Sequence, residues 1–164
     1  MPGDRQPPIR VGVLADTHIP TRRRALPIEI FEYFEGVVAI LHAGDITEAE
    51  VLEELAKVAP VHAVRGNMDH LTNLPRQLTV KIGGLRIGVV HEPPRERTAE
   101  GLQRQFGRPV HCVVFGHTHR TLNEVVGGVR LFNPGAVTGG HDGNHVGIIE
   151  IGEELTARLL PLLE

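Results

Sequence analysis

His117 and His119, which follow an apolar run, are the residues whose types and spacing most clearly suggest chemistry. The run before them, 110–115, is mostly apolar and β-branched, which favours a buried strand. Gly116 is expected to let the chain turn tightly after that strand. Side chains at positions i and i+2 then project from the same side of the backbone, where two imidazoles could bind a metal ion. In isolation this pattern is more often a pair of solvated loop histidines, so the metal hypothesis needs matching ligands elsewhere.

Side chains of ligand type also follow the other predicted strands. They come from four further segments, at Asp16 and His18, at Asp45, at Asn67 and at His91. Each alone has a structural explanation as a cap, a turn residue or ordinary loop surface. Ligands of parallel α/β sheets gather at the carboxyl ends of the strands, however, so these groups are expected to share one edge with the two histidines. The joint pattern therefore predicts a metal site.

The elements that must position these residues alternate in the first part of the chain. The predicted elements are strands 10–15, 37–41 and 61–64, a helix over 28–34, and a second helix that begins after Thr47 and ends before Pro60. Thr47 and Glu50 form a capping-box signature for the second helix. Alternating strands and helices favour parallel pairing, with the helices covering the sheet.

The pattern changes to hairpins in the second part of the chain. Strands are predicted over 77–82 and 85–90 around Gly83-Gly84, over 121–126 and 130–132 around Gly127-Gly128, and over 145–151 and 155–161. A helix over 98–106 is expected to end at Gly107, and 133–135 is expected to form a turn. The sum is an α/β sandwich of two sheets with helices outside, in one domain.

Length and composition indicate one soluble domain. The chain has 164 residues, of which 41% are hydrophobic and 23% charged, as in ordinary globular proteins. Its net charge of −3 gives no support for general nucleic-acid or anionic-membrane binding. No apolar stretch approaches the roughly 20 residues of a membrane span, and the polar residues 1–8 are predicted to be a flexible tail without a signal-peptide core. The single cysteine, Cys112, fits a reducing compartment, so a cytoplasmic location is expected.

The ordered motifs D-x-H, G-D, G-N-x-D, a lone histidine and G-H-x-H resemble those of the calcineurin-like metallophosphoesterase superfamily. The short chain and the run 65–69 are similar to the small YfcE-type phosphodiesterases within it, and 133–135 matches the family's turn after G-H-x-H. The resemblance extends from Arg10 to about Ile151. It implies a four-layer α-β-β-α sandwich of the metallo-dependent phosphatase type, formed as a single domain by residues 9–164.

The resemblance also implies two divalent metal ions per chain. The first ion would bind Asp16, His18, Asp45 and His119, and the second would bind Asp45, Asn67, His91 and His117. Two cations held about 3.5–4 Å apart need a shared anionic ligand, and Asp45 is the carboxylate placed to bridge them. Imidazole and oxygen ligands without thiolate suit Mn²⁺, Fe, Co²⁺, Ni²⁺ or Zn²⁺, and Mn²⁺ is the expected metal.

The activity implied by the resemblance is hydrolysis of phosphodiester bonds in a small phosphoester substrate. A hydroxide bridging the two ions would attack the phosphorus in line, while the ions stabilise the equatorial oxygens. Catalytic roles would fall to Asp45, Asn67 and His117. The residues that bind the rest of the substrate are not indicated, and neither is the oligomeric state.

Two positions depart from the family pattern. Larger relatives have a histidine after the G-N asparagine, where this chain has Met68, which cannot protonate a leaving group. Small relatives commonly have cysteine there, so the position does not argue against the subfamily. Asp69 and His70 are the nearest candidates for a general acid. Glu92 stands after His91, where relatives usually have glycine, and places a negative charge beside the site.

Two other functions stay open on the same scaffold. The retromer subunit Vps29 uses this fold mainly for protein–protein contacts and has a degraded metal site, whereas a phosphomonoesterase or nucleotide phosphatase would use the same two ions. All the ligand positions are filled here, which favours an enzyme.

The remaining histidines are interpreted structurally. His42 supports the end of the second strand, His62 and His111 lie within strands, and His141 and His145 flank a turn.

Overall fold

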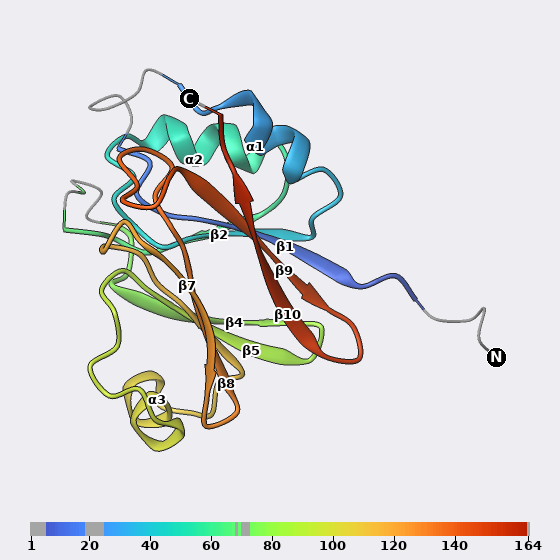
Figure 1. The fold of residues 1–164 in the computed structure, drawn as a ribbon, viewed down its shortest axis with the longest axis vertical. Coiled ribbons are helices and arrows are strands. Elements are labelled where there is room, and N and C mark those ends of the chain that lie inside the picture. The colour runs from blue at the N-terminus through green and yellow to red at the C-terminus, as the bar shows by residue number, and fades with distance from the viewer. Residues whose placement is uncertain (1–5, 19–24, 68, 70–72, 164) are drawn as a thin grey trace.

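The computed structural model describes residues 6–18, 25–67, 69 and 73–163. Its helices are α1 (Ile28–Tyr33), α2 (Ala49–Ala56) and α3 (Ala99–Phe106), and its strands are β1 (Ile9–Leu14), β2 (Ala39–His42), β3 (Val61–Ala63), β4 (Gln77–Ile82), β5 (Leu85–Val90), β6 (Cys112–Val114), β7 (Thr121–Val126), β8 (Val129–Pro134), β9 (His145–Ile151) and β10 (Leu155–Pro161). In this part of the chain the strands form two five-stranded sheets, ordered β10-β9-β1-β2-β3 and β4-β5-β6-β8-β7 (Figure 1).

The first sheet has a parallel half and an antiparallel half. β1, β2 and β3 run parallel, as the alternation of strands and helices predicted. β9 pairs antiparallel with β1, and β10 pairs antiparallel with β9. Side chains alternate along β1, so that Val11 and Val13 join the core toward the second sheet while Leu14 joins the core toward α1 and α2. Gly12 leaves room for Phe34, since a Cβ there would lie 2.9 Å from the phenyl ring.

The second sheet is built from two hairpins that flank β6. β4 pairs antiparallel with β5 and β7 with β8, while β6 lies parallel between β5 and β8. The predicted turns are confirmed, because Gly83 and Gly84 have φ of 59° and 80°, and Gly127 and Gly128 have 58° and 82°. Two consecutive positive φ angles fit the tight turns that glycine favours in hairpins.

Among the described residues, three apolar cores separate four layers, which confirms the α-β-β-α sandwich. Helices α1 and α2 cover one face of the first sheet, and α3 lies against the outer face of the second sheet (Figure 1). The first core includes Phe34 and Leu55, and the core between the sheets includes Leu41 and Val114. The third core, under α3, includes Leu102. Cys112 lies in the middle core, where burial raises the pKa of its thiol to about 12, so it packs as a small hydrophobe.

The two longer helices begin differently. Thr98 caps α3 by accepting the Gly101 N–H at 3.0 Å, and Gly107 ends the helix with φ of 76°. The capping box predicted for α2 is wrong. Glu48 precedes the first turn of α2 without a side-chain cap, and Thr47 has φ of 72°. Thr47 belongs instead to the loop 45–47, whose backbone N–H groups donate to the carboxylate of Asp69.

Several predicted boundaries also needed correction. Asn133 and Pro134 are the last residues of β8 and not a turn, because their pairing with β7 continues to that point; the turn begins at Gly135, with φ of 79°. β2 and β6 are shorter than the apolar runs that predicted them. Residues 1–5 of the predicted tail lie outside the described residues. In the described part of the chain, no helix is long and apolar enough to cross a membrane.

Candidate metal centre

The expected ligands lie in loops that leave the carboxyl ends of strands in both sheets. Asp16 and His18 follow β1, Asp45 follows β2, Asn67 follows β3, His91 follows β5, and His117 and His119 follow β6. Because β1 to β3 are parallel to one another, and β5 is parallel to β6, the loops of each sheet emerge at one edge. The two edges meet at one end of the sandwich, since ligand atoms of Asp16, His18 and Asp45 from the first sheet lie within 4.8 Å of that of His119 from the second.

The first group of side chains comprises Asp16, His18, Asp45 and His119, whose potential ligand atoms all lie within 4.8 Å of one another. Nε2 of His18 lies 3.4 Å from Nε2 of His119 and 3.8 Å from Oδ1 of Asp16. Oδ1 of Asp16 is in turn 3.6 Å from Nε2 of His119. Imidazole and carboxylate atoms that converge at such spacings can surround one transition-metal ion.

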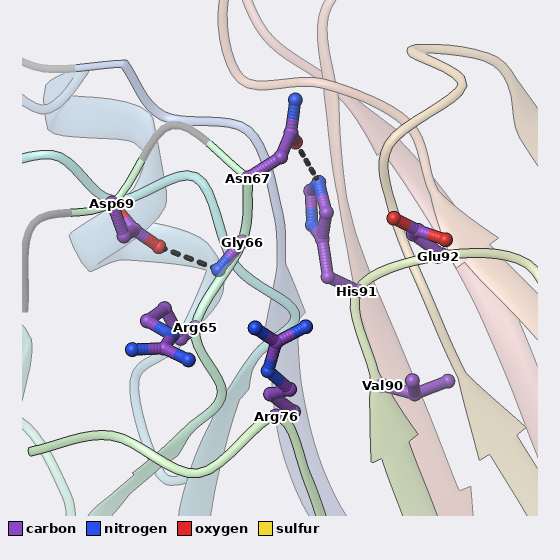
Figure 2. Close-up of a pocket in the computed structure, with 8 residues that line it drawn as sticks. All are labelled: Arg65, Gly66, Asn67, Asp69, Arg76, Val90, His91 and Glu92. Carbon is purple, nitrogen blue, oxygen red and sulfur yellow. Dashed lines mark hydrogen bonds between the residues drawn. The ribbon is translucent and has the colours of Figure 1, made fainter. Parts of the chain in front are cut away.

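The second group comprises Asn67, His91 and His117 together with Asp45. Nε2 of His91 lies 2.9 Å from Oδ1 of Asn67 (Figure 2) and 3.5 Å from Oδ2 of Asp45. The rings of His91 and His117 have centroids 5.2 Å apart. Oδ2 of Asp45 also lies 3.7 Å from Nε2 of His18, so this one carboxylate joins the two groups.

The surroundings of the Asn67 amide are rich in hydrogen-bond acceptors. Nδ1 of His91 lies 2.7 Å from the carbonyl oxygen of Ala43 and donates to it, which leaves a lone pair on Nε2 of the neutral ring. That lone pair faces another acceptor, Oδ1 of Asn67. Turning the amide over lets Nδ2 donate to His91 at 2.9 Å and to both Asp45 oxygens at 3.2 Å. The acceptors therefore converge on a point that suits either a donor or a metal ion.

The carboxyl group of Asp16 shows that a cation also fits the first group. Its Oδ2 accepts the His117 N–H at 3.1 Å, but its buried Oδ1 has no hydrogen-bond partner in the described structure. Burial, followed by the charge of Asp45, raises the pKa of Asp16 to about 7, although the charge of His91 opposes the shift. A bound cation would compensate both the unpartnered oxygen and the buried negative charge.

Backbone carbonyls orient two of the imidazoles. Nδ1 of His119 lies 3.1 Å from the carbonyl oxygen of Gly139, and Nδ1 of His91 binds Ala43 in the same way. A proton held on Nδ1 of a neutral imidazole leaves the lone pair on Nε2, the nitrogen that can then act as a ligand. Burial alone would lower the pKa of His91, but its hydrogen bond to Asp45 and the charges of Asp45 and Asp16 raise it overall.

The ligand loops have an unusual backbone. In the described part of the chain, the non-glycine residues with positive φ are Asp16, His18, Asp45, Thr47, His117 and His119, with φ between 49° and 72°. Non-glycine residues rarely adopt this region, and such strain clusters at functional sites. The backbone around His119 is therefore not extended, and the reasoning from i and i+2 spacing does not apply. The two histidines of this loop instead join different groups.

Gly116 is needed for a different reason from the one expected. Its φ does not fall among the positive values. A Cβ at this position would instead lie 2.8 Å from the Cβ of Ala15 and 3.0 Å from Oδ2 of Asp16. The glycine therefore allows the histidine loop to approach the β1 loop closely.

Asp69 holds the two loops that carry Asp45 and Asn67. Its carboxylate accepts four backbone N–H groups, from Asp45 at 2.9 Å, Ile46 at 2.6 Å, Thr47 at 2.6 Å and Gly66 at 2.8 Å. A carboxylate committed to four donors is poorly suited to be the general acid for which the sequence made it a candidate. The other candidate, at position 70, lies outside the described residues.

Other polar residues around the centre have supporting contacts. His42 is buried and accepts the Gly44 N–H at 3.1 Å, and burial lowers its pKa to about 3, so it supports the strand end as predicted. Asn133 donates to the Gly116 carbonyl at 3.1 Å and thereby holds the histidine loop, a role that the sequence did not indicate. The ring centroid of His141 lies 6.3 Å from that of His119, which places it at the rim of the first group.

Replacing Asp16 with asparagine is expected to stabilise the metal-free protein increasingly as pH rises. The carboxyl titrates near 3.8 in the unfolded chain but at about 7 in the folded protein. Its contribution to the free energy of unfolding is therefore lost as pH rises between these values, whereas asparagine does not titrate. In EDTA, the melting temperature of Asp16→Asn minus that of wild type should grow over this range. A constant difference would contradict the prediction, and added Mn²⁺ should raise the melting temperature of wild type more than that of the variant.

Comparisons with known proteins find relatives of similar sequence and fold. Residues 9–154 match the calcineurin-like phosphoesterase superfamily domain. A probable metallophosphoesterase of Methanocaldococcus jannaschii is 35% identical over 158 aligned residues, covering 94% of this chain and 82% of that protein. The solved structure of an archaeal phosphodiesterase is 25% identical, with a TM-score of 0.70 over 93% of this chain and 100% of that chain. The Zn²⁺ complex of Vps29 from Entamoeba histolytica is 26% identical, with a TM-score of 0.69 over 93% of this chain and 98% of that chain.

Proposed function

Because this chain belongs to the calcineurin-like phosphoesterase superfamily, a family of phosphoric ester hydrolases, we propose that it is a phosphodiesterase that works with two divalent metal ions. The observation that carries the proposal is the position of Asp45, whose Oδ2 lies 3.7 Å from Nε2 of His18 and 3.5 Å from Nε2 of His91. One carboxylate thus belongs to both groups of ligand atoms. The similarity to an archaeal phosphodiesterase over nearly the whole chain supports the choice of diesters.

The proposed ligands divide between the two ions. Asp16, His18, Asp45 and His119 would hold the first ion, and Asp45, Asn67, His91 and His117 would hold the second. Imidazole, carboxylate and amide oxygen without thiolate suit Mn²⁺, Fe, Co²⁺, Ni²⁺ or Zn²⁺, and the Vps29 relative was solved with Zn²⁺. Bound ions would supply Lewis acidity at the phosphate and a water molecule of lowered pKa as the nucleophile.

The protein's own residues prepare the site for this chemistry. Asp45 would offset the repulsion between two cations and fix their separation. Backbone carbonyls hold His91 and His119 with Nε2 toward the groups. A cavity beside Asn67 and His91 gives a substrate access to the second group. These features favour positioning and electrostatic stabilisation, which are the main sources of catalysis in phosphoryl transfer.

A protein-interaction scaffold is the second candidate, because Vps29 shares the fold. The two candidates differ in what the site must do, since a scaffold does not need a complete set of ligands. Here each expected ligand is present and the groups share a carboxylate, which favours the hydrolase.

Hydrolysis of bis-p-nitrophenyl phosphate by metal-stripped protein, titrated separately with Mn²⁺, Ni²⁺, Zn²⁺ and Mg²⁺, tests the proposal. We expect metal-dependent cleavage of this diester in preference to p-nitrophenyl phosphate. His117→Ala should abolish the activity, while His62→Gln, a histidine of β3 away from the ligand groups, should retain it. Preference for the monoester would indicate a phosphomonoesterase. Failure of the folded protein to cleave either ester with any metal would favour the scaffold.

A further inference from the structure

A cavity of about 540 Å³ lies beside the second ligand group, and its lining includes two arginines that the proposed chemistry does not use. Asn67 and His91 contribute to one part of the wall, and Arg65 and Arg76 contribute to another (Figure 2). The structure describes all the proposed metal ligands, and among them only Asn67 and His91 line the cavity. The arginines therefore lie beyond the second group and not between the two groups.

The backbone brings the two arginines together from different segments. Arg65 follows β3, whereas Arg76 directly precedes β4. The Arg65 N–H donates to the carbonyl oxygen of Pro75 at 2.8 Å, which ties the two segments to each other. Figure 2 shows the Arg76 guanidinium pointing into the space between Arg65 and His91. Within the described part of the chain, no hydrogen bond or ion pair engages either guanidinium group.

The acidic residues of the cavity leave the arginine end electropositive. The Asp69 carboxylate is occupied by backbone N–H groups of the loops around it. Glu92 is exposed, and Figure 2 shows it on the other side of His91 from Arg65. Neither carboxylate pairs with a guanidinium group, so both positive charges are available to a ligand. Metal ions held at Asn67 and His91 would add to the positive potential along the cavity.

We propose that Arg65 and Arg76 form an anion subsite, which binds a second phosphate of the substrate next to the diester that is cleaved. This inference builds on the proposed function and names its substrate class, phosphodiesters that carry a further phosphate on the neighbouring group. Guanidinium groups match phosphate oxygens with two parallel hydrogen bonds, and such charge-assisted bonds are the strong ones. The cleaved phosphate would lie against both ligand groups, and the cavity leads from the second group to the arginines.

The dinucleotides TpT and pTpT test the subsite, because they share one diester and differ by a 5′-phosphate. With Mn²⁺, wild-type kcat/KM should be at least about tenfold higher for pTpT, since tenfold requires only about 1.4 kcal/mol of added transition-state binding. Arg65→Gln and Arg76→Gln should each move this ratio toward one. Arg108→Gln, which removes an exposed arginine beyond α3, should leave the ratio unchanged.

Calorimetric binding of the same two dinucleotides in EDTA provides a readout that does not need catalysis. The wild-type protein should bind pTpT more tightly than TpT, and both arginine variants should lose the preference. A ratio near one in wild type, or a preference that both substitutions leave intact, would overturn the subsite. If no metal supports hydrolysis of either dinucleotide but the arginine-dependent binding preference is present, the subsite stands and the diesterase function fails.

Discussion

Asp45→Asn should lower kcat/KM for bis-p-nitrophenyl phosphate by at least about 1000-fold, which corresponds to about 4 kcal/mol of transition-state stabilisation. Asp45 approaches His18 in one ligand group and His91 in the other. An amide keeps the shape of the side chain but removes the negative charge that offsets repulsion between two cations. Steady-state kinetics with saturating Mn²⁺ measure the loss, and metal analysis should show fewer ions per chain.

A surface carboxylate provides the control for this substitution. Glu124 is an exposed residue of β7, so Glu124→Gln should keep the wild-type rate. Thermal unfolding in EDTA should show that Asp45→Asn is folded, because the substitution removes a nearly buried charge from the metal-free protein. Wild-type activity in Asp45→Asn, or an unchanged number of bound ions, would be incompatible with a bridging role.

Asp69→Ala is expected to lower the free energy of unfolding by about 3 kcal/mol or more, because hydrogen bonds to a charged group contribute about 1.5–3 kcal/mol each and are not fully additive. The substitution leaves the backbone N–H groups of Asp45, Ile46, Thr47 and Gly66 without their acceptor. The loops that carry Asp45 and Asn67 should then separate, so metal affinity should fall as well. Urea unfolding in EDTA measures the stability, and titration with Mn²⁺ measures the affinity.

Two further variants show whether the carboxylate itself is required. Asp69→Asn keeps one acceptor oxygen but turns an NH₂ group toward two of the four donors, so it should also be destabilised. Glu124→Ala, which removes an exposed carboxylate, should change the free energy of unfolding by less than about 0.5 kcal/mol. If Asp69→Ala unfolds at the same urea concentration as Glu124→Ala, the proposed role of Asp69 is wrong.

Local sequence signals predicted the elements whose ends are set locally. The bounds of the β4–β5 hairpin were predicted correctly because glycine pairs with positive φ join two alternating strands. The end of α3 was predicted because Gly107, which has a φ of 76°, is a local stop signal, whereas Thr98 caps the helix and is not its first residue. The start of α2 was wrong because Thr47 is held by Asp69, a partner far along the chain. The end of β8 was also misplaced, since pairing with β7 and not the local Asn-Pro-Gly pattern sets it.

The candidate site likewise combines features that the local sequence predicts with contacts that only the folded chain creates. Its acids and histidines were identifiable because each follows a strand, but their supporting contacts come from other segments. Nothing local shows that Asn133 holds the histidine loop or that Arg65 and Arg76 line one cavity. Gly66 of the G-N motif does begin a turn, in which the Asp69 N–H donates to the Gly66 carbonyl oxygen at 3.2 Å, but the sequence did not show why glycine is needed there. A Cβ at Gly66 would lie 2.2 Å from Oδ1 of Asp45, so the position is needed for close approach.

The proposed ligands come from loops of both sheets, so metal binding should affect the stability of the protein as well as its activity. The first group joins the β1 and β2 loops of one sheet to the β6 loop of the other, and His18 and His119 are 101 residues apart in the sequence. Ions bound there would act as a cross-link that closes a long loop, the task a disulfide performs in other proteins and one that a single cysteine cannot supply. Resistance to proteolysis should therefore depend on bound metal. Loss of the metal ions would make the protein both inactive and easier to degrade.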